Sequence, residues 1–288
     1  GIMMELSDVF TFTVPGAQFS PAYRNKFWDG KIRLLNVMTG LIYAGLLGYV
    51  EDFCEKRKYE IEYISDFSTE EFSIKEAKEF IARVKPTLEP RDYQLDAFVH
   101  AVRERRALLL SPTASGKSFI IYLLVRYYAK RTLIIVPTTS LVSQLASDFA
   151  DYGFVSDRFV HRIFAGQDKQ TDKPITISTW QSIYKMPKEY FKQFDVVIGD
   201  EAHLFKAKSL TSILTKLSDC KYRFGFTGTL DGSNTHKLVL EGLFGPVRKV
   251  TTTAELIEQN HLSKFMIKCI VLRYQDAERQ LVSKMDYQ

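Results

Sequence analysis

The sequence predicts an α/β protein whose parallel sheet is covered by helices on both faces, preceded by a small α+β domain. From residue 91 onward, short apolar runs alternate with stretches of helical periodicity, as in successive strand–helix units. Before residue 85 the strand and helix patterns are shorter and mixed. The two parts also differ in charge, because residues 1–85 carry a small acidic excess, whereas the remainder carries the basic excess behind the net charge of +5.

The first 85 residues are expected to form the small domain. Asp29-Gly30 is typical of a hairpin turn, and Thr39-Gly40 begins a second turn. Ser73 and Glu76 form a capping box, which predicts that a helix begins there. The expected elements are extended segments at 23–28, 31–38, 41–46 and 59–64, and helices at 46–54 and 74–84.

The segment 85–90 contains two prolines and lacks periodicity, so the sequence places a domain boundary there. The runs that follow are apolar nearly throughout, as in strands covered on both faces. A polar stretch at 166–173 predicts an exposed loop. The expected strands are 107–111, 132–136, 158–164, 175–179, 195–199 and 223–227.

Residues 111–118 lie between an expected strand and an expected helix, and their sequence is typical of a P-loop NTPase. In such a loop, backbone N–H groups and a helix N-terminus hold phosphate oxygens, while Lys117 reaches the β- and γ-phosphates. The alternative is a solvated lysine ahead of an ordinary helix, since the first loop position is Ser rather than Gly. The predicted phosphate-binding residues are Ser111, Pro112, Thr113, Ala114, Ser115, Gly116, Lys117 and Ser118.

Asp200 and Glu201 directly follow the apolar run 195–199. The carboxyl end of a parallel strand is where open α/β sheets bind ligands. Ser118 and Asp200 would hold Mg²⁺ there, and Glu201 would orient or deprotonate the attacking water. The alternative is a solvated strand end that caps a helix. The two motifs in this order predict that the chain binds and uses ATP with Mg²⁺.

The tetrad Asp200-Glu201-Ala202-His203 resembles motif II of superfamily 2 helicases of the DEAH type. Further blocks stand in the order of that family, at 91–94, 136–141, 178–182 and 226–229. The resemblance covers about 86–274 and implies a helicase ATP-binding, RecA-like first lobe. Ala114 departs from the pattern, because many members of the superfamily have Gly at this position.

The resemblance implies roles for the residues that match these blocks. Helix capping at strand–helix junctions is the alternative for the threonines among them. The implied residues are Arg91 and Gln94 at the adenine, Lys117, Asp200, Glu201 and His203 in catalysis, Thr138, Thr139 and Thr179 at the nucleic-acid backbone, and Thr227 and Thr229 in coupling.

The N-terminal stretch 27–35, with 39–41, resembles the leader domain of phage recombination and repair helicases. Cations and aromatic residues alternate around Lys26, Lys31 and Arg33. Such a surface can hold phosphates with its cations and stack on bases. The alternative is that the aromatic side chains pin the turn onto its own helix while the charges stay solvated. DNA binding by this small domain is therefore a hypothesis.

Composition excludes several classes of protein. The three cysteines are far apart and fit neither a disulfide framework nor a zinc site. No apolar run approaches the ~20 residues needed to span a bilayer, and no signal-peptide pattern is present. We expect a protein of the phage or bacterial host cytoplasm with no membrane partner.

Superfamily 2 motors contain two RecA-like lobes, and the second lobe supplies arginine fingers. The chain stops at Gln288, and residues 275–288 are expected to begin the linker to a second lobe that is missing here. An arginine finger contributes about 10³–10⁵ to the rate of phosphoryl transfer. We therefore expect this fragment alone to be nearly inactive as an ATP hydrolase.

The leading interpretation is an ATP-dependent DNA helicase or translocase that unwinds or remodels single-stranded or branched DNA in recombination and repair. One alternative is the motor part of a restriction-type translocase. Another is a non-catalytic nucleic-acid-binding module with a vestigial nucleotide site. The presence of Lys117, Asp200 and Glu201 argues against this alternative. An RNA helicase and a small-molecule kinase fit the ordered motifs less well.

Overall fold

A computed structural model describes residues 1–64, 69–164, 166–204, 207–230, 234–263, 268 and 270. Residues 1–253 form one compact unit and residues 254–288 a second. The described part of the second unit contains most of α13 (Thr253–Glu258). Cys269 and the expected linker at 275–288 lie outside the described residues. No helix in the described ranges is long and apolar enough to cross a membrane.

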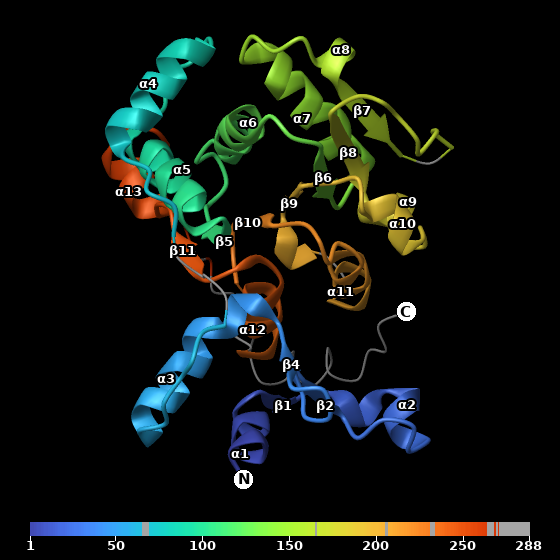
Figure 1. Ribbon diagram of the computed structural model, residues 1–288. Coiled ribbons are helices and arrows are strands. Elements are labelled where there is room, and N and C mark those ends of the chain that lie inside the picture. The colour runs from blue at the N-terminus through green and yellow to red at the C-terminus, as the bar shows by residue number, and fades with distance from the viewer. Residues whose placement is uncertain are drawn as a thin grey trace. The chain divides into compact units, whose positions relative to one another are not determined.

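A seven-stranded sheet forms the centre of the first unit, and all of its strand pairs are parallel (Figure 1). Its spatial order is β11-β5-β10-β9-β6-β8-β7, so the order in space differs from the order along the chain. This confirms the predicted fold class. The strands are β5 (Arg106–Leu110), β6 (Thr132–Val136), β7 (Val160–Ile163), β8 (Ile175–Thr179), β9 (Val196–Gly199), β10 (Tyr222–Thr227) and β11 (Val247–Lys249).

The predicted strands lie where the apolar runs placed them, because those runs are buried on both faces. β6 and β8 have the predicted bounds, and every residue of both is buried. Residues 158 and 159 belong instead to a short helix, α8 (Ser156–Phe159), which precedes β7. β11 was not predicted, since it has three residues, none of them fully buried, and lacks an apolar run. The predicted loop at 166–173 is exposed along most of its length.

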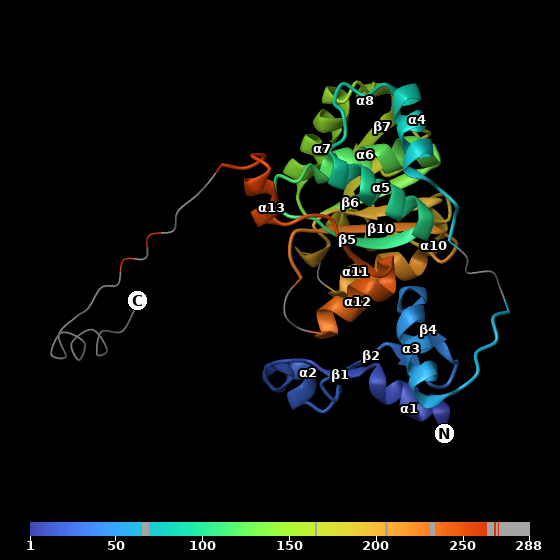
Figure 2. The ribbon, with the colours of Figure 1, turned by 90° about the vertical axis from the view of Figure 1, so that its left-hand side faces the viewer.

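Helices cover both faces of the sheet (Figure 2). Strand residues alternate between the two layers: Ala107 and Leu109 pack with the first layer, and Leu108 packs with the second. This division places two hydrophobic cores on opposite sides of one sheet. The first layer contains α4 (Ile74–Val84), α5 (Asp92–Glu104), α6 (Lys117–Tyr128) and α7 (Thr139–Asp151), and the second contains α9 (Trp180–Ile183), α10 (Lys188–Phe191), α11 (Ala207–Lys216) and α12 (Asn234–Phe244).

The predicted capping box begins α4. The Ser73 hydroxyl accepts a hydrogen bond from the Glu76 backbone N–H, and the Glu76 carboxylate accepts one from the Ser73 N–H at 2.7 Å. Buried Ala77 lies in the same core as the apolar side chains of α5 and α6. These contacts join α4 to the first helical layer, and the domain boundary placed after residue 85 stays a prediction.

The N-terminal segment consists of short elements. Its small sheets are two antiparallel pairs, β1 with β2 and β3 with β4, and the predicted turn at Thr39-Gly40 joins the second pair. The elements are α1 (Ile2–Val9), β1 (Thr11–Thr13), the 3₁₀ turn η1 (Ala17–Phe19), α2 (Pro21–Arg24), β2 (Lys31–Arg33), β3 (Leu35–Asn36), β4 (Leu41–Ile42), the 3₁₀ turn η2 (Ala44–Leu46) and α3 (Leu47–Arg57).

The hairpin predicted around Asp29-Gly30 is wrong. Ser20 caps α2 by accepting a hydrogen bond from the Tyr23 N–H, and Pro21 stands in the first turn of that helix. A Ser-Pro pair thus begins a helix where the sequence predicted a strand, and β2 pairs with β1 instead. The strand predicted at 59–64 is absent, since these described residues have no regular structure. The helix predicted at 46–54 is confirmed as α3.

A buried carboxylate fastens the N-terminal segment to α12. The Tyr49 hydroxyl on α3 donates a hydrogen bond to Glu241 Oε2 at 2.7 Å, and the Val247 N–H donates one to Oε1 at 3.2 Å. Burial first, and this hydrogen bond second, raise the pKa of Tyr49 to about 12. Gly45 of η2 packs directly against the backbone of α12, since a Cβ placed on Gly45 would be 1.9 Å from the backbone oxygen of Glu241.

Candidate nucleotide site

The loop between β5 and α6 is held from inside by two serines. The Ser111 and Ser115 hydroxyls are hydrogen-bonded at 2.6 Å, and Ser115 Oγ donates to the carbonyl of Pro112 at 2.7 Å. The Ser111 N–H donates to the Thr227 carbonyl at 2.8 Å, which ties the loop to β10. Ser111 thus replaces the usual glycine with a side chain that braces the loop.

Two left-handed residues shape the rest of the loop. Ala114 has φ +64° and Gly116 has φ +76°. A left-handed alanine costs roughly 1–2 kcal/mol, which the serine bonds offset. Within the described chain, the N–H groups of Ala114, Gly116 and Lys117 donate no hydrogen bond to a backbone acceptor. Unpaired N–H groups in such a turn ahead of a helix form a concave site for an anion, so these residues fit a phosphate.

The segment 91–94 lies against this loop. Gln94 Nε2 donates to the Ser115 carbonyl at 2.9 Å, and its Oε1 accepts from the Arg91 N–H at 2.9 Å. The Tyr93 hydroxyl also donates to the Ser115 carbonyl, at 3.0 Å, and accepts from Arg91 Nη1 at 2.7 Å. The structure therefore brings Arg91 and Gln94 to the loop. Their contact with adenine stays a prediction.

Tyr93 also contacts the loop, although only Arg91 and Gln94 of the block 91–94 were predicted as site residues. Its place between those two residues is the only feature of the sequence that points to it. A tyrosine in the first turn of a helix is ordinary, and nothing local shows that its hydroxyl reaches a loop twenty-two residues away.

Asp200 and Glu201 emerge from β9 beside Lys117. Lys117 Nζ lies 2.5 Å from Glu201 Oε1, and the two side chains are 12% and 21% exposed. The Asp200 N–H donates to the Ile135 carbonyl of β6, and Asp200 Oδ1 accepts from the Glu201 N–H at 3.0 Å. The loop and the strand end thus meet at one site, as the two motifs predicted.

His203 and Thr227 extend this site by hydrogen bonds. Thr227 Oγ1 donates to the Thr229 carbonyl at 2.6 Å, so its lone pair accepts from His203 Nδ1 at 2.7 Å. That requirement places a proton on Nδ1, which also lies 3.5 Å from Glu201 Oε2. Thr227 and Thr229, the residues predicted to couple the site to nucleic acid, are therefore linked to the Glu201 carboxylate through the His203 imidazole ring.

Ser118 makes a different contact from the predicted one. Its hydroxyl is hydrogen-bonded to the Tyr152 hydroxyl at 2.7 Å, at the end of α7. It also approaches Asp148, whose pKa is raised by burial and lowered in part by the Ser118 hydrogen bond. No described hydrogen bond joins Ser118 to Asp200. The shared Mg²⁺ site of these two residues stays a prediction.

The threonines predicted at the nucleic-acid backbone lie at two neighbouring strand ends. Val136 of β6 pairs with Thr179 of β8, and Gln181 Nε2 donates to the Pro137 carbonyl at 3.3 Å. Thr138 and Thr139 are exposed, whereas Thr179 is buried and hydrogen-bonded to Ser182. Thr138 also caps α7, so the capping alternative holds for this residue without excluding the other role.

The cations predicted to contact DNA lie in the N-terminal segment. Arg33 Nη2 forms an ion pair with Asp29 Oδ2 at 2.5 Å, so its charge is largely compensated. Lys26 and Lys31 are exposed. In the described part of the chain, no hydrogen bond or ion pair joins these three residues to the loop 111–118. Their contact with DNA stays a prediction.

The buried Asp200 carboxyl predicts a stability that falls as the pH rises. Burial raises the pKa of Asp200 from 3.8 to about 6, and the Lys117 ammonium opposes this shift. The folded chain then binds more protons than the unfolded chain between about pH 4 and pH 6, so the free energy of unfolding decreases through this window. At about 1.4 kcal/mol per pKa unit, the loss is roughly 3 kcal/mol.

Urea unfolding at a series of pH values, with Asp200→Asn beside the unaltered chain, measures this effect. The asparagine does not titrate, and every other carboxyl is present in both proteins. The difference between the two pH profiles therefore isolates Asp200, and parallel profiles would contradict the prediction.

Two family profiles match the chain. The profile described as type III restriction enzyme, res subunit, matches residues 87–232, and that of the DNA helicase UvsW N-terminal region matches residues 1–64. The ATP-dependent DNA helicase uvsW of Enterobacteria phage T4 is 37% identical over 286 residues, covering 94% of this chain and 57% of that protein. The DNA 3'-5' translocase XPB2 of Sulfurisphaera tokodaii is 28% identical over 197 residues, covering 68% and 43%.

Solved structures give the same result. A crystal structure of the UvsW helicase from bacteriophage T4 has a TM-score of 0.79 at 37% identity, and covers 86% of this chain and 93% of that one. A second T4 UvsW crystal structure has a TM-score of 0.80 and covers 88% and 54%. The chain spans about half the length of the curated relatives it matches. It belongs to the UvsW family of superfamily 2 helicases.

Proposed function

We propose that this chain binds Mg-ATP at the loop 111–118 and is the ATP-binding lobe of a DNA helicase or translocase that acts in recombination and repair. The observation that carries the proposal is the convergence of Lys117, Asp200 and Glu201 at one sheet edge. The loop N–H groups that donate to no backbone acceptor in the described chain include those of Lys117 itself and of Ala114 and Gly116, within three residues before it. Helicase function is further supported by the 37% identity to a protein named as an ATP-dependent DNA helicase.

Nucleotide binding requires an exchange of partners. Lys117 must leave Glu201 to reach phosphate oxygens, and Ser118 must leave Tyr152 to serve as a metal ligand with Asp200. Mg²⁺ bound there would neutralise phosphate charge. Release of Lys117 frees the Glu201 carboxylate to orient the attacking water. The ion pair therefore keeps both residues occupied until a nucleotide separates them.

DNA would contact the strand ends at Thr138, Thr139 and Thr179. Thr227 and His203 connect the end of β10 to the Glu201 carboxylate, so a shift of β10 would change the Thr227–His203 bond. Because His203 also lies beside Glu201, the position of the carboxylate depends on that bond. This chain of contacts supports a coupling role for Thr227 and Thr229.

A second candidate is the motor of a restriction-type translocase. The match of residues 87–232 to the res subunit profile favours it. The match of residues 1–64 to the UvsW N-terminal profile favours the recombination helicase. A vestigial nucleotide site fits less well, because the lysine and both carboxylates are present and in contact.

Glu201→Gln tests the proposal. The amide cannot pair with Lys117 as a carboxylate does, so we expect Mg-ATP affinity to be unchanged or to rise by up to about tenfold. ATP hydrolysis should fall by about 10²–10⁴ wherever it is measurable, since the group that activates water is lost. Equilibrium titration with Mg-ATP, followed by a hydrolysis assay, separates the two effects.

DNA supplies the second arm of the test. Fluorescent single-stranded and branched DNA should bind the chain, with an affinity that falls as salt rises. Binding of Mg-ATP without binding of either DNA would overturn the DNA assignment and leave a nucleotide-binding protein of another kind. Failure of the unaltered chain to bind Mg-ATP would overturn the whole proposal.

A further inference from the structure

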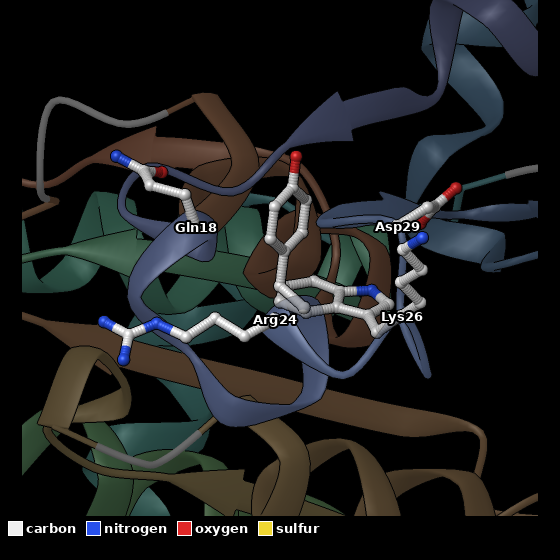
Figure 3. Close-up of a pocket in the computed structure, with 6 residues that line it drawn as sticks. Gln18, Arg24, Lys26 and Asp29 are labelled. Atoms are coloured by element: carbon white, nitrogen blue, oxygen red, sulfur yellow. The ribbon is translucent and has the colours of Figure 1, made fainter.

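A cavity of about 550 Å³ lies in the N-terminal segment, beside η1 and α2. This volume is in the range of small-ligand sites. In Figure 3, Gln18 and Arg24 lie on one side of it and Lys26 and Asp29 on the other. The residues that line it are Gln18, Tyr23, Arg24, Lys26, Trp28 and Asp29.

The two aromatic walls of this cavity are fixed in position. The Trp28 indole N–H donates to the Lys31 carbonyl at 2.9 Å. The Tyr23 ring lies against Gly30, where an added Cβ would be 3.0 Å from two ring carbons. Gly30 admits the close approach of the ring because it has no Cβ, and its φ of +76° makes the turn. Neither ring needs to be ordered when a ligand enters.

The two cationic side chains of the cavity are free to bind an anion, whereas its one carboxylate is already paired. Arg24 and Lys26 are exposed, and within the described residues neither side chain has a hydrogen bond or an ion pair. Asp29 accepts hydrogen bonds from Arg33 and from the Lys31 N–H, and these hold its pKa at about 2. Its charge is compensated by Arg33, so the cavity presents two uncompensated positive charges.

Two further exposed aromatic residues stand next to the lining residues in the sequence. Phe19 is 70% exposed and Phe27 is 86% exposed, and both directly neighbour residues that line the cavity. Both rings are therefore accessible for contact with a ligand. Planar rings beside exposed cations suit a ligand that is itself planar at one end and anionic at the other.

We propose that this cavity takes one unstacked nucleotide of single-stranded DNA. The base would stack on Tyr23 beside Trp28, the Gln18 amide would face its polar edge, and Arg24 and Lys26 would hold the flanking phosphates. Stacking tolerates any base, so the site would grip a strand without reading its sequence. The inference rests on the proposed DNA function and adds a binding site outside the ATP-binding lobe.

The base-binding part is tested with two ligands of equal charge. A short oligothymidine and an abasic oligonucleotide of the same length carry the same phosphates. The unaltered chain should bind oligothymidine about 5- to 100-fold more tightly. Tyr23→Leu, which keeps apolar bulk against Gly30 but removes the aromatic face, should lose much of this preference. Tyr23→Phe keeps the ring and is the matched control that should retain it.

The phosphate-binding part needs a charge-matched control. Arg24→Ala with Lys26→Ala should weaken binding of both oligonucleotides alike and reduce the salt slope by about 0.7 per lost contact. The control is Arg83→Ala with Lys85→Ala. It removes the same charges from exposed positions, and Lys85, like Lys26, has a left-handed backbone. It should leave affinity and slope nearly unchanged.

Fluorescence reports occupancy directly. Trp28 and Trp180 are the two tryptophans of the chain, so Trp180→Phe leaves Trp28 as the sole reporter. Oligothymidine should quench it, and the abasic strand should quench it far less. Thymidine monophosphate should bind much more weakly than the strand. Equal affinity for that mononucleotide would show a free-nucleotide site and overturn the assignment to DNA.

The outcomes separate the two levels of the proposal. If Tyr23→Leu still prefers oligothymidine over the abasic strand, the pocket is overturned. The pocket is also overturned if the unaltered chain shows no preference for bases and the Arg24/Lys26 variant merely loses affinity for both strands. Both leave the DNA function standing. If the unaltered chain binds no DNA, the proposed function fails first, and the pocket fails with it.

Discussion

Lys117→Ala is expected to weaken Mg-ATP binding roughly 100-fold or more, because it truncates a half-buried cation at the meeting point of the loop and β9. The variant loses the group that would reach the phosphates. It also leaves the Glu201 carboxylate without its partner, beside an Asp200 whose charged form is already disfavoured by burial. Two neighbouring carboxylates without a cation repel one another and would attract a proton.

Isothermal titration with Mg-ATP measures the loss. Lys216→Ala is the matched control, since Lys216 is also half-buried and donates to the carbonyls of Tyr184 and Met186, away from the loop 111–118. The control should bind Mg-ATP normally. An affinity for Mg-ATP in Lys117→Ala within about threefold of the unaltered chain would contradict a phosphate-binding role for the loop.

Gly45→Ala is expected to have the largest effect on stability. A Cβ at this position would lie 1.9 Å from the backbone oxygen of Glu241, 2.9 Å from its carbonyl carbon and 3.0 Å from the oxygen of Gly242. No side-chain rotation relieves a clash with backbone, so η2 must move away from α12 and break the Tyr49–Glu241 hydrogen bond. We expect a loss of about 3 kcal/mol or more, which lowers the melting temperature by roughly 6–12 °C.

Gly48→Ala provides the comparison, three residues further along the chain. Gly48 lies inside α3, and nothing is within 4 Å of the position its Cβ would take. An alanine there should stabilise the helix by about 0.5–1 kcal/mol. Thermal unfolding of the two variants should therefore shift in opposite directions. Similar shifts in both would mean that the contact between η2 and α12 contributes little.

The strands and the acidic strand end were predictable because each leaves a local signal. β6 and β8 are apolar runs buried on both faces, and no helix periodicity competes with them. Asp200 and Glu201 stand directly after such a run, so their place at the sheet edge follows from the direction of a parallel strand. The capping box of α4 involves residues only three apart.

The order of the strands in the sheet left no comparable signal. β5 lies between β10 and β11, its partners from far along the chain. The Ser118–Tyr152 contact was likewise unpredictable, because it depends on how α6 packs against the end of α7. The error at residues 23–28 had another cause. An Asp-Gly pair outweighed a serine cap and a proline that together begin α2.

Strand order also has a consequence for synthesis of the chain. β5, which precedes the phosphate loop, is the first strand of the large sheet to leave the ribosome, yet its neighbours are β10 and β11. At about 5–20 residues per second, the ~110 residues that separate β5 from β10 take roughly 6–20 s to appear. Throughout that delay the nascent chain exposes an unpaired apolar edge. The candidate nucleotide site is thus among the last features to form, and chaperones have several seconds in which to bind β5.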